Sequence, residues 1–138
     1  MTSFRDTAQF NYWNTSLRQA MIDQVLFIAQ HCDGVRCDMA HLLLNQQYAT
    51  LWGKYLAAYP RPEQEFWAEC ISKVKEKFPN FIFVAETYAN HHLLQSLGFD
   101  YVYNKIIYDL LVVADIHEIK KYISRQSFSF LSHCCLCK

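Results

Sequence analysis

The apolar positions of this chain alternate between helical spacing and short continuous runs. Residues separated by three and four positions predict amphipathic helices over 17–32 and 67–78. Asn14 precedes the first helix as a cap-type residue, and Pro62 is well placed to begin the second. A loop or short helix between the two helices contains a run of leucines at 42–44.

Short apolar runs of strand length lie between the helical segments. Residues 35–40 form one strand candidate directly after Gly34, residues 81–85 form a second, and residues 101–103 form a third. Because the run 81–85 is apolar at every position, it is typical of a parallel strand that is covered on both faces. A short helix over 90–97 is predicted before the third strand.

Two further helical stretches are predicted after the third strand. Asp115 stands three residues before Glu118, which is the spacing of a capping box at the start of the second stretch. The alternation of helices and strands predicts an α/β fold in which βα units surround a parallel sheet. Residues 126–138 break this pattern, so we expect one domain over 1–125 followed by an unrelated tail.

Composition and charge narrow the class of protein. A chain of 138 residues, of which 52% are hydrophobic, suits a globular domain rather than a disordered segment. Thirteen basic residues balance thirteen acidic ones with no block of like charge, so the charge pattern of a nucleic-acid binder is missing. No apolar run approaches the roughly 20 residues that span a membrane, and no apolar signal segment opens the chain. We therefore expect a cytoplasmic protein with no nucleic-acid or membrane partner.

The six cysteines divide into two groups of three. Cys32, Cys37 and Cys70 stand singly in apolar patterns, so we expect small buried side chains in a reducing compartment. The other three lie within residues 133–137, beside a histidine. A zinc site usually needs two separated pairs of ligands, and this cluster has no clear second pair, so no metal site is predicted.

Two carboxylates stand at the ends of predicted strands. Asp38 lies near the end of the first strand, and Glu86 directly follows the second. The carboxyl ends of parallel strands are where active sites are built, so the two acids are expected to converge on one cleft. A charge at the end of an apolar strand is also common as a simple point of solvation, and both interpretations remain open at this stage.

Arg36 lies two residues before Asp38, and therefore on the same face of an extended strand. Its charge would lower the pKa of Asp38 and keep that acid ionised, as a nucleophile requires. Glu86 follows five apolar residues, and a dry setting would favour the protonated form that a general acid requires. One ionised and one protonated carboxyl group would suit cleavage of a glycosidic bond with retention. A purely structural Arg–Asp pair fits the same residues equally well.

Four segments of the chain, in order, resemble glycoside hydrolase family 13, the α-amylase family. Residues 34–40 are similar to its nucleophile strand, in which Gly, Arg and Asp alternate with other residues. Residues 83–88 resemble the next motif, where a Glu ends the fifth barrel strand. Residues 97–111 resemble the sixth strand and its following segment, and residues 6–12 resemble the approach to the third helix. The likeness spans roughly residues 4–112.

The resemblance implies a fold and a set of roles. It implies strands 4 to 6 of a (β/α)8 barrel, whose complete form needs about 250 residues. Asp38 would be the nucleophile, Glu86 the general acid/base, Arg36 the group that orients the nucleophile, and Tyr88 a residue that lines the sugar cleft. The substrate would be an α-glucan or oligosaccharide. No cofactor is expected, and the calcium of the parent family has no ligands that can be placed here.

The chain also departs from the family pattern. His41-Leu42 stand where many members have Lys-His after the nucleophile, and a solvated loop histidine is expected at 41. The upstream motif of the third strand is missing, and so is the downstream Asn-His-Asp motif that carries the third catalytic acid. Asp109 and Asp115 lie in different sequence contexts. We therefore expect a fragment of a retaining glycoside hydrolase that is inactive as an isolated chain. The alternative is a non-catalytic remnant or interaction module of such a barrel.

This interpretation has consequences for geometry and assembly. Asp38 and Glu86 should lie at the carboxyl ends of adjacent parallel strands, with their carboxylate oxygens about 5–9 Å apart and Arg36 within charge-pairing reach of Asp38. Three parallel strands leave two unpaired edges, and the barrel-facing side of the sheet would be uncovered. We therefore expect the chain to self-associate.

Overall fold

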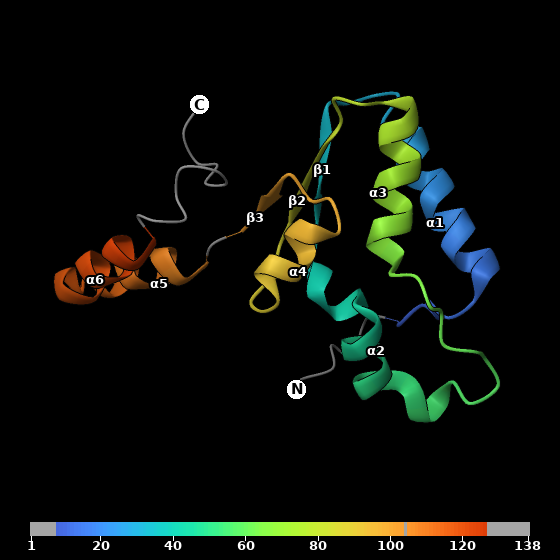
Figure 1. Cartoon of the computed structure of the whole chain (residues 1–138), viewed down its shortest axis with the longest axis horizontal. Coiled ribbons are helices and arrows are strands. Elements are labelled where there is room, and N and C mark those ends of the chain that lie inside the picture. Colours follow the sequence, from blue (N-terminus) through green and yellow to red (C-terminus); the bar gives the residue numbers. More distant parts are fainter. Residues whose placement is uncertain (1–7, 104, 127–138) are drawn as a thin grey trace.

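Three short parallel strands organise the fold. The computed structural model describes residues 8–103 and 105–126 (Figure 1). The strands pair in the order β1-β2-β3, all parallel. Their bounds are β1 Gly34–Cys37, β2 Ile82–Ala85 and β3 Tyr101–Val102. All three predicted strands are thus present, and the parallel arrangement is consistent with part of an α/β barrel.

Helices connect and cover these strands. On one side of the sheet, α1 (Thr15–Ile28) packs beside α3 (Phe66–Lys77) (Figure 1). Three short helices follow β1, namely η1 (Ala40–Leu43), α2 (Asn45–Trp52) and η2 (Gly53–Tyr55). The remaining helices are α4 (His91–Ser96), α5 (Lys105–Val113) and α6 (Ile116–Gln126). Their order preserves the predicted alternation of helix and strand.

The first helix begins as predicted but ends early. The Asn14 side chain accepts hydrogen bonds from the N–H groups of Ser16 and Leu17, at 2.9 and 3.1 Å. At the other end, the N–H groups of residues 30 and 31 bond to carbonyls three residues back, so the chain tightens and leaves the helix before 32. Cys32 is therefore exposed, and the prediction of a buried side chain was wrong for this cysteine but confirmed for Cys37 and Cys70.

The third helix begins at Phe66 rather than at Pro62. The four residues before it are held by the start of α2. Asn45 donates its side-chain amide to the Pro62 carbonyl at 2.9 Å, and its backbone N–H to Glu65 Oε2 at 2.9 Å. This contact between distant segments keeps residues 62–65 extended, and the proline signal alone does not predict it.

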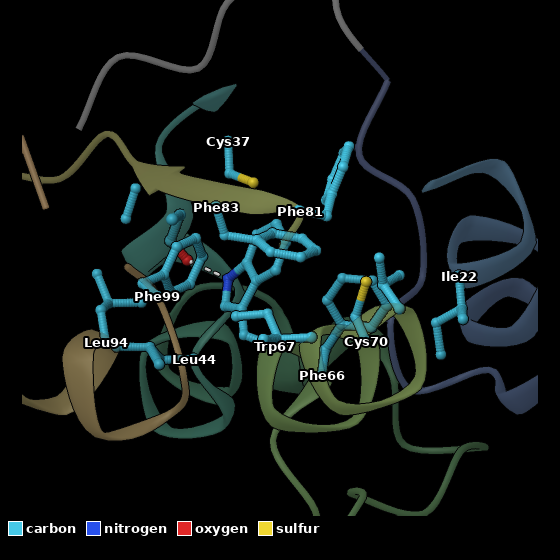
Figure 2. Packing of buried hydrophobic residues seen from close by; sticks show 14 of the residues in the cluster. Ile22, Cys37, Leu44, Phe66, Trp67, Cys70, Phe81, Phe83, Leu94 and Phe99 are labelled. Atoms are coloured by element: carbon cyan, nitrogen blue, oxygen red, sulfur yellow. Dashed lines mark hydrogen bonds between the residues drawn. The ribbon is translucent and has the colours of Figure 1, made fainter. Parts of the chain in front are cut away.

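Aromatic rings fill the space between the sheet and the helices (Figure 2). Trp67 of α3 lies edge-on to Phe99, with ring centroids 5.1 Å apart, and Phe99 lies edge-on to Phe83 of β2 at 6.2 Å. The Trp67 indole N–H donates to the Ala40 carbonyl at 2.8 Å. This bond fixes the turn after β1 on the core, and so fixes the position of the residues at the end of that strand.

Only one face of the sheet is covered by this core. Phe83 and Ala85 are buried, whereas Ile82 is 38% exposed. Arg36 pairs in register with Val84 and therefore shares the face of Ile82. The prediction that residues 81–85 are covered on both faces was wrong, because Ile82 on this face of β2 is exposed while Phe83 and Ala85 on the other face are buried.

The last two helices extend away from the side of the sheet opposite α1 and α3 (Figure 1). Asp115 caps α6 as predicted, because its Oδ1 accepts the N–H of Glu118 at 3.0 Å. Within the described residues, no helix combines the length and the apolar character needed to cross a membrane. The cysteine cluster within 133–137, and the rest of the predicted tail after 126, lie outside the described residues.

Candidate active site

The pairing of β1 with β2 places the two candidate acids side by side. Cys37 and Ala85 are partners in the parallel register, and each is the last residue of its strand. Asp38 and Glu86 come directly after them. The prediction that these acids stand at the carboxyl ends of adjacent parallel strands is therefore confirmed.

The backbone around Glu86 joins β2 to the turn after β1. The Glu86 N–H donates to the Cys37 carbonyl at 2.9 Å, and the Glu86 carbonyl accepts the N–H of Ala40 at 2.8 Å. Between these two bonds, Met39 adopts the left-handed conformation with φ 45°. That conformation is uncommon for a residue with a side chain, and here it ends β1 and turns the chain toward η1.

The Glu86 side chain is surrounded by hydrogen-bond donors. Glu86 is only 8% exposed. Its Oε2 accepts the Arg36 guanidinium at 2.9 Å and the Met39 N–H at 3.3 Å, and its Oε1 accepts the Tyr88 hydroxyl at 2.9 Å. Arg36 and Tyr88, which were both singled out in the sequence, thus meet on this one carboxylate.

Asp38 lies at the open side of the same cluster. Its side chain is 78% exposed, and its Oδ1 lies 3.9 Å from Arg36 Nη1. The predicted reach of Arg36 to Asp38 is thus confirmed, although the shorter contact of Arg36 is with Glu86. The ionisations of Asp38 and Glu86 are linked, with a side-chain hydrogen bond between them as one cause of both pKa shifts. The separation of about 5–9 Å between their oxygens stays a prediction.

This hydrogen bond reverses the expected ionisation order. The bond to Glu86 raises the pKa of Asp38, with burial and the Glu86 charge adding to it, and Arg36 only partly opposes them. Burial raises the pKa of Glu86, but its bonds to Asp38, Tyr88 and Met39 and the Arg36 charge outweigh burial and lower it. The predicted directions were a lowered Asp38 and a raised Glu86, and the structure has the opposite in both cases.

His41 is the residue that the sequence interpretation underrated. A solvated loop histidine was expected, but His41 is buried in η1, with its ring 6.2 Å from the Tyr88 ring. Burial and the nearby His91 lower the pKa of His41, while the Glu86 charge partly opposes them. Its Nδ1 is buried without a hydrogen-bond partner. The sequence signal that could have placed His41 near the candidate site was its position three residues after Asp38.

The arrangement can hold a proton on either of two carboxyl groups, Asp38 and Glu86, beside the Arg36 guanidinium. Carboxyl groups that share a hydrogen bond titrate as a pair, and the first to ionise is the one with more donors. The described residues contain no group of three or more His, Cys, Asp or Glu side chains that could hold a metal ion. Two carboxyl groups beside a cation can supply acid, base or nucleophilic chemistry.

The fold and this edge of the sheet define the class of architecture, a partial α/β barrel. The chain is similar in fold to part of a solved structure, the alpha-amylase from Lactobacillus plantarum, with a TM-score of 0.59 and 20% sequence identity. The overlap covers 91% of this chain and 29% of that protein, so the chain spans less than a third of its length. No family model matches the chain, and no curated protein matches its sequence. A likeness at this identity shows the fold alone.

Proposed function

We propose that the chain carries the catalytic carboxylate pair of an α-amylase-type retaining glycoside hydrolase. The observation that carries this proposal is the placement of Asp38 and Glu86 after the paired residues that end β1 and β2. The fold shared with part of an α-amylase supports it. In that framework, β1, β2 and β3 would be strands 4 to 6 of the complete barrel, and the substrate would be an α-glucan or oligosaccharide.

The exposure of the two acids fits a division of roles. The Asp38 carboxylate, which is open to solvent, would attack the anomeric carbon and form a glycosyl ester. Glu86 in its acid form would donate its proton to the departing glycosidic oxygen. The ionised Glu86 would then take a proton from the water that cleaves the ester. Arg36 would orient Asp38, and Tyr88 would line the sugar cleft beside Glu86.

This cycle needs the two carboxyl groups not to be hydrogen-bonded to each other. Retaining enzymes hold them about 5–5.5 Å apart, with substrate atoms between them. A sugar oxygen that enters between Asp38 and Glu86 would replace their direct hydrogen bond. Removal of that bond would lower the pKa of Asp38 and raise that of Glu86, which is the ionisation order that the reaction requires.

A chimeric barrel tests the proposal. Residues 15–103 would replace the segment of the Lactobacillus plantarum alpha-amylase on which they overlay, and reducing-sugar release from starch would be measured. We expect activity that falls by at least about a thousandfold in D38N and in E86Q. D23N is a matched control, because it removes an exposed acid of α1 that is not among the residues of the carboxylate cluster. A folded but inactive chimera would contradict a catalytic role.

The chain on its own, outside a chimeric barrel, is expected to release no reducing sugar. Its sheet is open along both edges in the described structure, and its sequence carries no Asn-His-Asp motif for the third acid. The measurement is release from starch and maltooligosaccharides by the purified chain. Turnover by the isolated chain that is lost in E86Q would contradict this expectation, because the carboxylate pair would then suffice without the rest of a barrel.

One observation favours a second function, a non-catalytic module derived from such a barrel. The direct hydrogen bond between Asp38 and Glu86, with Arg36 across both, can also be a structural clasp between β1 and β2. In that case, D38N and E86Q would lower the stability of the chain, while the folded chimera would be inactive. The chimera therefore separates the two functions.

A further inference from the structure

His41 is a buried residue that the proposed catalytic cycle does not use. It lies in η1, three residues after Asp38. The residue before it, Ala40, donates its N–H to the Glu86 carbonyl at 2.8 Å and accepts the Trp67 indole N–H at 2.8 Å. The backbone that carries His41 is therefore fixed both to the end of β2 and to the core.

The His41 ring packs against the ring of Tyr88. Their centroids are 6.2 Å apart and their planes stand at 84°, the edge-to-face arrangement that aromatic pairs prefer. Tyr88 lies in the loop between β2 and α4 and is 46% exposed. The Thr87 hydroxyl, which accepts the Ala89 N–H at 3.2 Å, fixes the backbone of this loop but not the direction of the Tyr88 side chain. The contact with His41 restrains that direction.

Tyr88 carries this restraint to one oxygen of Glu86. The Tyr88 hydroxyl donates to Glu86 Oε1 at 2.9 Å, whereas Arg36 and the Met39 N–H donate to Oε2. The bond from Tyr88 is one of the causes that lower the pKa of Glu86. A displacement of the Tyr88 ring would therefore change the surroundings of this carboxylate.

The environment of His41 suits a neutral ring. Burial and the nearby His91 of α4 lower the pKa of His41 from its ordinary 6.5, and the Glu86 charge opposes them only in part. A protonated imidazole carries an N–H on both nitrogens. Within the described residues, the buried Nδ1 of His41 has no hydrogen-bond partner that could accept such an N–H. Above its ordinary pKa, His41 therefore acts on Tyr88 through ring packing and not through charge.

We propose that His41 is a positioning residue, whose neutral ring holds the Tyr88 hydroxyl on Glu86 Oε1. His41 acts through Tyr88 and needs no contact with a substrate. The contact itself is a property of the folded chain, and only its consequence for catalysis rests on the proposed function. In that cycle, loss of the His41 ring would leave Glu86 without a fixed donor and would lower kcat.

The ¹³C NMR signal of the Glu86 carboxyl group, recorded on the intact chain at about pH 8, tests the contact, because His41 is then neutral and Glu86 is ionised. Y88F marks the change that loss of the Tyr88 bond causes. We expect H41A to move the Glu86 signal in the same direction, and H41F, which keeps an aromatic ring, to restore it. H92A removes an exposed histidine of α4 and is the control, with no expected change.

The double variant H41A/Y88F separates an action through Tyr88 from a direct effect of His41. We expect it to give the Glu86 signal of Y88F alone, because the two changes break one chain of contacts. H41L fills the space without an aromatic ring and replaces H41A in this test if H41A does not fold. A Glu86 signal that does not move in H41A or H41L, or that moves equally with and without the Tyr88 hydroxyl, would overturn the proposal.

The chimeric barrel provides the second arm. There, H41A should lower kcat by about tenfold or more, as a loosened catalytic group implies. An unchanged kcat in an active chimera would overturn the positioning role. A folded wild-type chimera without activity would contradict the proposed function instead, and the Glu86 signal of the intact chain would still decide whether His41 holds Tyr88.

Discussion

Arg36 connects the two carboxylates of the candidate site although its own side chain is exposed. It lies 2.9 Å from Glu86 and 3.9 Å from Asp38, so one cation spans the ends of two strands. An ion pair this open to solvent contributes little to folding stability. Its consequence is local, because its charge favours the ionised form of Glu86 and helps to lower the pKa of that residue.

A second ion pair, away from the site, carries more of the stability. Arg18 of α1 is 5% exposed and donates to Glu69 of α3 at 2.9 and 3.2 Å. E69Q would leave that buried cation without its counter-ion, so we expect the free energy of unfolding to fall by about 3 kcal/mol. The measurement is urea denaturation at pH 7. E76Q alters an exposed glutamate of the same helix and should have little effect.

The pH dependence of stability gives an independent check on Glu69. Burial raises the pKa of Glu69, but hydrogen bonds from Lys73 and Arg18 outweigh it, and the net pKa lies below the ordinary glutamate value. Its contribution to stability is therefore full above that ordinary value and is lost as the pH falls through the lower folded pKa. Wild type and E69Q should converge at low pH. A constant difference between them would contradict this ionic account.

The sequence predicted that Arg36, Asp38 and Glu86 come together but not the directions of the carboxyl pKa shifts. Asp38 lies near the end of the first predicted strand, Glu86 ends the apolar run 81–85, and period-two alternation places Arg36 on the face of Asp38, so their convergence follows from a parallel sheet. The reversed pKa directions depend on the left-handed turn at Met39 and on the reach of Arg36 across to β2. Neither feature has a local sequence signal.

At the scale of elements, the close approach of β1 and β2 depends on Gly34. A Cβ added there would lie 2.6 Å from the Ile82 carbonyl oxygen and 2.9 Å from the Ile82 Cβ. We expect G34A to lower the free energy of unfolding by about 2 kcal/mol, because β2 must shift to accept it. Urea denaturation measures this effect.

Gly53 is a matched control for this change. A Cβ there would meet Trp13 at 3.7 Å, which is ordinary contact, and its backbone is helical with φ −51°. G53A should therefore change stability by no more than about 1 kcal/mol, in the stabilising direction. Equal losses in G34A and G53A would show that close strand approach is not the cause.

The elements themselves were largely predictable, and their boundaries were less so. Apolar spacing located the three strands and most of the helices, although the segment expected as a loop or short helix after β1 holds η1, α2 and η2. Asn14 and Asp115 cap α1 and α6 as their positions indicate. The errors came from contacts between distant segments. Residues 62–65 are held by Asn45 and so delay α3, a contact that cap and proline signals do not encode.

At the scale of the whole molecule, apolar surface remains uncovered on two parts of the chain. One is the face of β2 that carries Ile82, and the other is the helical pair α5–α6, where Leu111, Val112, Val113 and Ile116 are exposed. Edges and apolar faces of this kind promote association between chains. We therefore expect the chain to form oligomers.

Light scattering coupled to gel filtration tests this prediction. The molar mass should rise with protein concentration, and V113K, which puts a charge on the most exposed of these residues, should reduce the rise. H117K adds a charge at an exposed polar position of α6 and serves as the control. A mass that stays at that of one chain, 16.3 kDa, at every concentration would contradict the prediction.

The proposed catalytic role depends most directly on the linked ionisation of Asp38 and Glu86. A ¹³C NMR titration of the two side-chain carboxyl groups measures it. We predict that Asp38 titrates above, and Glu86 below, the ordinary carboxyl range, and that E86Q lowers the Asp38 pKa by removing the Glu86 charge while Arg36 remains. Ordinary and independent titration of both groups, with Asp38 unchanged in E86Q, would show that the sheet does not unite them in one site.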